Sequence, residues 1–579
     1  MRSPFEGEEG DVMAEVVNIE TDILIIGGGA AGCFAAVEAR TLEPGVRCLI
    51  MEKAHIDRSG CLAMGLNSIN AYLHPGETPE SYLDYVKKEF MDLVREDLVL
   101  SIAEGLNDTV KKVEEWGLPI DKDSEGRYMP RGQRGVRIQG ERLKPILAEA
   151  VRRSKVEVLN RVAATNLIVS GGRVAGAFGL GVRDGKLYVV RAKAVIVAAG
   201  GASGIYKTAN PGDARHLIWY SPWNVGTGYA LGIRTGAEMT CFENRFIALR
   251  VKDVQAPTGM LVLGAGAKQV NARGEQYLDK YYKDHPVKSA ATYFRLLATM
   301  QENSAGRGPC FLDLSHLRRG SEEARRFEGD LLNMSPSMAL LWAGRDDHDG
   351  GDSRFEIAAS EPYVVGGHGE AGYWIDVKRR TTVPGLYAAG DVAGGAPKKY
   401  ASGSWVEGRI AVRTALEEIR SVGVSDVDAE AVEVEKRRVT APLDRSEGIA
   451  PQDMEERLQK LMDEYAGGLS TRYELNEEKL LIARDRLSGL RDSGVDMLKA
   501  GSRHELVSAM EVVDRIDVSR VLVEHLLHRR ETRWPCSQSR LDYPERDDGH
   551  WLRFVNSVMD KKTGEIGIIE RGLNDNDRL

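Results

Sequence analysis

Short apolar runs alternate with small-residue segments at the start of the chain. The run Thr21 to Ile26 is typical of a buried strand, and it leads into the glycine-rich turn 27–32. A helix of small residues is predicted to about Arg40. A second apolar strand, Val46 to Met51, then ends at Glu52. This order of strand, glycine turn, helix, strand and acid predicts a βαβ unit that binds a dinucleotide.

Each glycine of this turn has its own physical role. Gly27 permits the tight turn, Gly29 lets the backbone approach a pyrophosphate, and Gly32 lets the helix pack on the sheet. The free N–H groups and positive dipole end of the helix N-terminus favour the phosphates. Glu52, 20 residues after Gly32, is expected to accept hydrogen bonds from the ribose. The alternative is a glycine-rich turn without a ligand, which would leave the position of the acid unexplained.

Later apolar runs predict more strands of the same sheet. Residues 156–164, 166–169 and 174–182 read as strands, with a hairpin turn at Gly171 and Gly172. The segment 194–201 is a buried strand that runs into a glycine pair, and 385–391 is another strand that ends in an acid. Residues 402–404 then open a helix over 406–419, whose N-terminus could hold a ligand oxygen or a phosphate.

The alternation breaks between Ser203 and about Asp376. This aromatic- and glycine-rich stretch predicts an inserted α+β domain. From Asp426 to about Arg530 the sequence is charged and helical, with 3.6-residue periodicity over 454–465 and 475–490. The segment from Trp534 reads as a short, turn-rich tail packed on the body.

Composition and charge narrow the function classes. A chain of 579 residues is long enough for several domains, and its net charge of -9 argues against nucleic-acid binding. No apolar run approaches the ~20 residues that span a bilayer, so we do not expect an integral membrane protein. The acidic N-terminal segment does not read as a secretory signal. The six cysteines form no C-x-x-C motif, which favours a reducing cytoplasm and an electron-transfer partner for any redox chemistry.

Five motifs together resemble the FAD-dependent fumarate reductase/succinate dehydrogenase flavoprotein superfamily. They are GGGAAG at 27–32, AAGG at 198–201, GTGYALGIRTGAEM from Gly226, TTVPGLYAAGDVAGG from Thr381 and SRLDYPERDDGHWL from Ser539. The resemblance covers about residues 20–420 and the tail. It implies an α/β protein with a Rossmann-like FAD-binding domain, an inserted α+β capping domain and a C-terminal helical domain. The expected bounds are 1–19 for a disordered lead-in, 20–203 and 377–425 for the FAD-binding domain, 204–376 for the cap, 426–533 for the helical domain and 534–579 for the tail.

By position, the resemblance implies a set of FAD contacts. They are Gly27, Gly29, Ala31, Gly32, Glu52, Lys53, Ser59, Gly60, Ala163, Ala199, Gly200, Gly201, Asp391, Ser402 and Ser404. Covalent members of the superfamily attach FAD to a histidine that follows Arg-Ser. Here Gly60 follows Arg58 and Ser59, so we expect FAD to be bound non-covalently.

Two further departures separate the chain from fumarate reductases. These enzymes carry a proton-delivering arginine eight residues before the N-x-x-G-E motif. That motif is present here at 271–275, but Leu263 stands at the earlier position and cannot donate a proton. The substrate arginine is replaced by Lys398 and Lys399, which lack its bidentate geometry. These lysines could also be ordinary solvated charge.

The same departures and several local strings resemble the adenylylsulfate reductase alpha subunit. Among these strings are GLNSINAY at 65–72, VREDL at 94–98, EWGLPI at 115–120 and EPY at 361–363. The resemblance implies that the reacting sulfur is surrounded by Asn70, Arg250, Leu263 and His368. It also implies that Trp219 lines the nucleotide pocket, and it places Glu141, Arg307 and Tyr400 at the pocket margin.

The implied reaction converts adenylylsulfate and two electrons into sulfite and AMP, or the reverse, through a flavin N5–sulfite adduct. Arg250 and a protonated His368 would supply positive charge, and Trp219 could stack on adenine for roughly 1–3 kcal/mol. The resemblance also implies that the partner is a ferredoxin-like iron–sulfur beta subunit. Structural readings remain open: Arg250 could form an ordinary ion pair, Asn70 could cap a turn, and Trp219 could fill the seam between cap and core.

Two other functions remain open from the sequence. One is a fumarate reductase/succinate dehydrogenase-type flavoprotein that acts on an alkene, and the other is a flavin electron-transfer module of an iron–sulfur complex. Only 13 positions separate His368 from Thr381, fewer than adenylylsulfate reductase alpha subunits usually have. A related enzyme that reduces another substrate therefore also fits.

Overall fold

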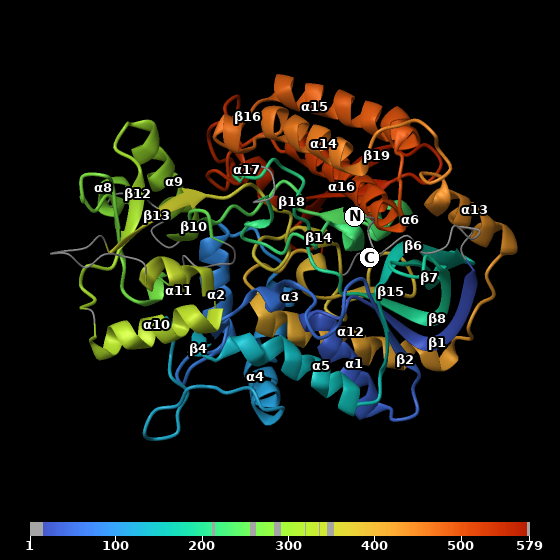
Figure 1. Cartoon of the computed structure of the whole chain (residues 1–579), viewed down its shortest axis with the longest axis horizontal. Coiled ribbons are helices and arrows are strands. Elements are labelled where there is room, and N and C mark those ends of the chain that lie inside the picture. The colour runs from blue at the N-terminus through green and yellow to red at the C-terminus, as the bar shows by residue number, and fades with distance from the viewer. Residues whose placement is uncertain are drawn as a thin grey trace, which may run out of the picture.

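A computed structural model describes residues 15–210, 215–254, 262–282, 291–318, 320–334, 336–343 and 353–575 (Figure 1). The predicted disordered lead-in, 1–19, lies outside the described residues for 1–14. For 16–19 that prediction is wrong, because strand β1 (Val16–Ile26) already begins at Val16. Its first residues pair with the start of β8 (Leu187–Val197), a partner far along the chain that no local pattern reveals.

The main sheet has seven strands in the order β5-β2-β1-β8-β7-β6, with β15 also beside β8. On the side away from β1, the long strand β8 pairs with two different strands. Its first half pairs antiparallel with β7, and Val195 to Val197 pair in parallel with β15. The other bounds are β2 (Cys48–Glu52), β5 (Glu157–Asn160), β6 (Val162–Ser170), β7 (Arg173–Gly181) and β15 (Leu386–Ala388). The strands predicted from apolar runs are thus present in one sheet.

Alternate residues of β1 serve two cores. Ile23 and Ile25 pack with α1 (Ala30–Leu42), α5 (Leu143–Arg153) and α12 (Tyr400–Glu418), where Phe34 stacks on Trp405 at 5.1 Å. Leu24 and Ile26 belong to the core on the other face, which includes α6 (Thr227–Thr235). The small helices α2 (Pro79–Glu89), α3 (Glu96–Ala103) and α4 (Leu106–Glu115) and the pair β3 (Ser68–Asn70) and β4 (Gly135–Arg137) complete this half of the chain.

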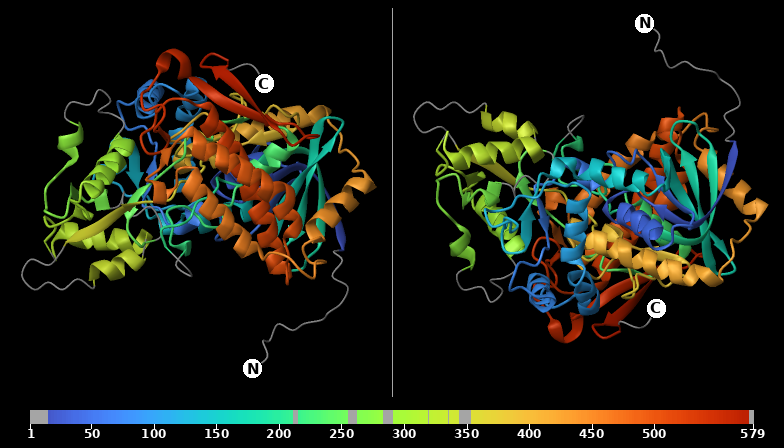
Figure 2. Two further views of the ribbon diagram at one scale, coloured as in Figure 1. Left: turned by 90° about the horizontal axis from the view of Figure 1, so that it is seen from above. Right: turned by 90° about the horizontal axis from the view of Figure 1, so that it is seen from below.

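A separate lobe stands at one end of the molecule, opposite the β6–β7 hairpin (Figure 2). Its sheet has the order β10-β13-β12-β11, with all pairs antiparallel and its own apolar core. The strands are β10 (Leu249–Val251), β11 (Lys268–Val270), β12 (Cys310–Asp313) and β13 (Arg354–Ala359). The helices are α8 (Leu278–Tyr282), α9 (Ala291–Ser304), α10 (Glu322–Met334) and α11 (Pro336–Ala343).

The third sheet joins the middle of the chain to its end. Its order is β14-β9-β18-β19, where β9 (Met239–Thr240) and β14 (Gly372–Tyr373) lie in the sequence assigned to the cap. Strands β18 (Arg553–Met559) and β19 (Ile566–Gly572) form a hairpin in the tail. The expectation of a turn-rich tail is therefore wrong, because β18 pairs antiparallel with the distant strand β9. The short pair β16 (Glu474–Leu475) and β17 (Ser539–Arg540) and helix α17 (Asp548–Trp551) also belong to this region.

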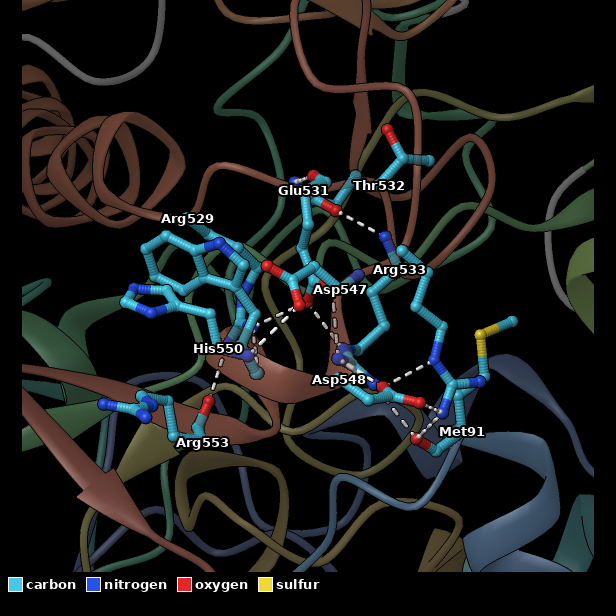
Figure 3. A network of polar contacts seen from close by, with 12 residues as sticks. Met91, Arg529, Glu531, Thr532, Arg533, Asp547, Asp548, His550 and Arg553 are labelled. Atoms are coloured by element: carbon cyan, nitrogen blue, oxygen red, sulfur yellow. Dashed lines mark hydrogen bonds and ion pairs between the residues drawn. The ribbon is translucent and has the colours of Figure 1, made fainter.

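Helices α13 (Ala429–Thr440), α14 (Pro451–Tyr465), α15 (Glu477–Gly489) and α16 (Arg503–His528) form the helical region. After α16, a network of charged side chains attaches the segment that follows this helix to the body of the protein (Figure 3). Glu531 accepts hydrogen bonds from Arg529 and Arg533, and Arg533 also reaches the backbone oxygen of Met91. Among the described helices, none combines the length and the apolar character needed to cross a membrane.

Candidate active site

A cavity of about 870 Å³ extends from the glycine turn of the main sheet to the separate lobe. Its walls come from the sheet, from loop 59–70, from segment 219–227, from the lobe and from helix α16. This volume lies in the range of cofactor and substrate sites. Most of the residues that sequence analysis assigned to FAD and substrate meet here.

The glycine turn has the shape that a pyrophosphate needs. Gly27 has φ +103°, and an added Cβ there would lie 2.6 Å from the backbone oxygen of Ala198. A Cβ on Gly32 would lie 1.9 Å from the Gly27 oxygen, so neither position admits a side chain. Helix α1 starts after Gly29, which makes no side-chain cap, so the first N–H groups stay free for an anion beside the cavity. The residues present fit FAD.

The acid after β2 is held by the backbone. Glu52 accepts hydrogen bonds of 2.8 Å from the N–H groups of Gly28 and Ala54, and it lines the cavity. The predicted contacts that line the cavity are Gly27, Gly29, Ala31, Glu52, Lys53, Ser59, Gly60, Ala163, Ala199, Gly200, Asp391 and Ser404. Gly32, Gly201 and Ser402 do not line it. The hydroxyl of Ser402 instead donates to the backbone oxygen of Asn70 at 2.6 Å.

Helix α12 begins at Tyr400, six residues before the predicted start at Val406. Ser402 and Ser404 therefore lie in its first turns. Beside this end, Asp391 accepts a 2.6 Å hydrogen bond from the Tyr220 hydroxyl. Burial raises the pKa of Asp391 despite this hydrogen bond.

The inner end of the cavity has an aromatic wall. The rings of Trp219 and His368 meet edge to face at 4.7 Å, and Phe246 and Tyr400 lie 4.9 Å and 5.0 Å from the imidazole. Trp219 is fixed through its backbone N–H, which donates to the Tyr363 hydroxyl at 3.1 Å. These side chains come from segments far apart in the sequence, and Trp219, Phe246, His368 and Tyr400 all line the cavity.

His368 is uncharged at neutral pH. Burial, with a further contribution from Lys398, lowers its pKa to about 3. In the free protein this shift disfavours the protonated form of His368 that the resemblance implies, because no described carboxylate offsets the loss of water. Its Nδ1 has no hydrogen-bond partner among the described residues, so the ring retains an open site for hydrogen bonding.

Two cations that line the cavity were not assigned to the site from sequence. Lys398 is 4% exposed and pairs with Glu89 at 3.2 Å, so the solvated-charge reading is wrong. Burial lowers the pKa of Lys398, but Tyr85 and Glu89 raise it more, and the ammonium stays charged. Arg295 of α9 also lines the cavity, and its guanidinium has no hydrogen-bond or ion-pair partner in the described parts of the chain. No local sequence motif identified Arg295 as a site residue, and only its position on α9 in the structure shows that it lines the cavity.

Arg250 lies behind the cavity wall. It is buried next to Leu249, which lines the cavity, and its Nη1 donates to the backbone oxygens of Leu217 and Val254 at 3.2 Å each. Its Nε has no partner among the described residues. Leu263 and Asn70 both line the cavity, and Asn70 accepts a 3.2 Å hydrogen bond from the Ser68 hydroxyl.

Two predicted pocket residues lie elsewhere. Arg307 donates to Glu302 at 2.8 Å and 2.9 Å and does not line the cavity, because this local pair holds it on the lobe. Glu141 is exposed just before α5 and does not line the cavity either. Tyr400 does, and of the three predicted pocket residues only Tyr400 is thus brought to the cavity in the described structure.

Comparisons with known proteins identify the family of the chain. The FAD binding domain family matches residues 22–404, and the fumarate reductase flavoprotein C-terminal family matches 455–576. The adenylylsulfate reductase alpha subunit of Megalodesulfovibrio gigas is 31% identical, over 98% of this chain and 97% of its own. The L-aspartate oxidase of Streptomyces coelicolor is 28% identical, over 93% of this chain and 91% of its own.

Solved structures point the same way. The structure of adenylylsulfate reductase from Archaeoglobus fulgidus is 36% identical, with a TM-score of 0.91 and 99% of both chains covered. A structure of adenosine-5-phosphosulfate reductase in complex with sulfite, as a covalent adduct, matches to the same extent. The chain is therefore an FAD-binding flavoprotein and belongs to the family of adenylylsulfate reductase alpha subunits.

Proposed function

We propose that the chain is the FAD subunit of an adenylylsulfate reductase, which interconverts adenylylsulfate with sulfite and AMP in a two-electron reaction. The observation that carries the proposal is the inner end of the cavity. There an aromatic wall, formed by the buried Trp219 and Phe246 and the half-buried His368 and Tyr400, lies in the same pocket as the cations Lys398 and Arg295. An aromatic base and an anionic sulfur group would find complementary surfaces in this pocket.

The charge change of the reaction explains the need for these cations. Cleavage of the sulfur–oxygen bond by two electrons gives AMP and sulfite, and it adds two negative charges to the bound groups. Fixed cations in a site shielded from water stabilise such a gain of charge. Arg295 can bind the ligand because no described protein group occupies its guanidinium. Lys398 is held in place by Glu89.

The reaction requires no proton on carbon. This agrees with Leu263, which lines the cavity and has no proton to give, and with an uncharged His368. His368 can still offer a hydrogen bond from its imidazole, while the rings around it exclude water. Reduction of an alkene would require a proton donor at this end of the cavity.

FAD supplies the two electrons. We propose that it is held by contacts alone, because Gly60 lines the cavity at the position where covalent members carry a histidine. We further propose that the electron partner is a ferredoxin-like iron–sulfur subunit, and that the protein has a role in sulfur metabolism and a cytoplasmic location. Five of the six cysteines are buried as free thiols, which suits a reducing compartment.

The visible spectrum of the purified protein tests the function. Addition of sulfite should bleach the flavin absorption, and later addition of AMP should change the extent of bleaching. Acid precipitation should leave all FAD in the supernatant. A spectrum unchanged by sulfite, or rapid turnover of fumarate with a reduced viologen dye, would contradict the proposal.

A further inference from the structure

Helix α16 forms one wall of the cavity, a role that no sequence motif indicated. Val507, Met510, Glu511 and Asp514 line the cavity, and their spacing places them on one face of the helix. The same end of the cavity is lined by Glu52, Lys53 and Ala54, where the ribose of FAD is expected. The helical region therefore contributes to the cofactor site at its adenosine end.

An ion pair connects this wall to the strand that carries the ribose-binding acid. Lys53 Nζ donates to Glu511 Oε1 at 2.6 Å and to the backbone oxygen of Trp223, also at 2.6 Å. The two charged side chains are 27% and 18% exposed. Because both side chains remain partly exposed, salt ions can still screen the attraction between them.

The next turn of α16 is firmly anchored. Asp514 accepts hydrogen bonds from Thr227 at 2.6 Å and from Arg234 at 2.8 Å. Arg515 donates to the backbone oxygen of Ser203 at 3.1 Å. The anchors hold α16 beside segment 203–234, and the contact of Glu511 with Lys53 extends this attachment one turn further, over the cavity.

We propose that Lys53, Glu511 and the Trp223 carbonyl form a clasp that encloses the adenosine end of FAD and limits its release. Glu511 is in this view a positioning residue, because it acts through Lys53. Opening the clasp separates three segments: the end of β2, loop 219–225 and α16. The proposal depends on FAD binding and not on which substrate the flavin reduces.

The rate of FAD release from the full-length holoprotein tests the clasp. It can be followed as the rise of flavin fluorescence after dilution. We expect Glu511→Gln to release FAD roughly threefold to tenfold faster than the unmodified protein. The matched control is Glu96→Gln, which removes the Lys87–Glu96 pair on the surface. The control should release FAD at the unmodified rate.

A salt titration separates a clasp from a general structural effect. Release from the unmodified protein and from Glu96→Gln should accelerate between about 0.05 M and about 0.5 M salt. Release from Glu511→Gln should depend less on salt, because only the contacts of the pyrophosphate remain to be screened. The double variant with Lys53→Gln should be less impaired than the sum of the single variants.

Either of two results would overturn the clasp. One is release from the unmodified protein that does not respond to salt, a result that needs no variant to fold. The other is an equal release rate for Glu511→Gln and Glu96→Gln. Loss of sulfite bleaching with normal clasp behaviour would overturn only the proposed function.

Discussion

Two buried polar regions of this molecule differ in how fully their groups are paired. In the network beyond α16 (Figure 3), Arg529, Glu531 and Arg533 are fully buried, and every charged atom has a partner. In the cavity, His368 Nδ1 has no partner and the Arg295 guanidinium is also free in the described structure, and behind the cavity wall Arg250 Nε is likewise unpaired.

The difference distinguishes polar groups that stabilise the fold from polar groups that are available to bind a ligand. Leaving a buried polar group unpaired costs about 1–3 kcal/mol, so a protein keeps such groups mainly where a ligand will satisfy them. The network stabilises the attachment of the chain end to Met91. The unpaired groups of the cavity leave hydrogen-bonding capacity for a ligand. Substitutions in the two regions should therefore have opposite signatures.

The largest expected effect is on stability, in the network. Glu531→Ala would leave Arg529 and Arg533 without their shared carboxylate. We expect the free energy of unfolding to fall by about 3–5 kcal/mol, measured by denaturant unfolding of the FAD-bound protein. Glu545→Gln, at an exposed position in the same region, should change it by less than about 0.5 kcal/mol. Equal stability of both variants would contradict the comparison.

Arg295→Gln should show the reverse signature. We expect the KM for adenylylsulfate to rise about tenfold to a hundredfold, because a charged hydrogen bond to the anion is lost. The free energy of unfolding should change by no more than about 0.5 kcal/mol, since no described protein partner is lost. Arg273→Gln, an exposed arginine of the same lobe, serves as the control in steady-state kinetics. A normal KM for Arg295→Gln would remove Arg295 from the site.

The His368 imidazole gives a pH-dependent prediction. The pKa of His368 is about 3 in the folded protein against about 6.5 in the unfolded chain, so the unfolded chain binds the proton first. Stability is lost as the pH falls from 6.5 toward 3. His368→Gln should lessen the loss between pH 7 and pH 4 by roughly 3 kcal/mol. Denaturant unfolding at both pH values measures it, and identical pH profiles would show that His368 titrates normally.

The smallest expected effect concerns the aromatic wall. Trp219→Phe keeps an aromatic ring but reduces the area available to adenine, so we expect the KM for adenylylsulfate to rise about threefold to tenfold with kcat little changed. The control Trp342→Phe alters a half-buried indole of the lobe that does not line the cavity, and it should change KM less than about twofold. A fall in kcat alone would assign Trp219 to the chemistry rather than to binding.

Much of the main sheet could be predicted because its signals are local. The alternation of β1, the small residues of α1 and the acid after β2 lie within about thirty neighbouring positions, and the structure confirms these elements. Helix starts were less accurate: α12 begins at Tyr400, which has φ +52°, and the serines at 402 and 404 gave no sign of this earlier start.

The role of a site residue could be predicted only where its own local segment determines that role. The burial of Lys398 depends on Glu89, which lies on α2, and the low pKa of His368 depends on rings from three other segments. Arg295 has no motif at all. Arg307 was expected in the pocket from its position in the family, but it forms an ion pair with Glu302, five residues earlier. The family position alone did not reveal this ion pair.

The β18–β19 hairpin also constrains biosynthesis. Strand β9 emerges from the ribosome more than three hundred residues before β18, and until then its edge has unpaired N–H and C=O groups. A chain cut short by a premature stop near residue 550 would keep the whole glycine turn and most of the cavity walls, yet would present this open edge to other chains. Such a truncated product should aggregate or be degraded.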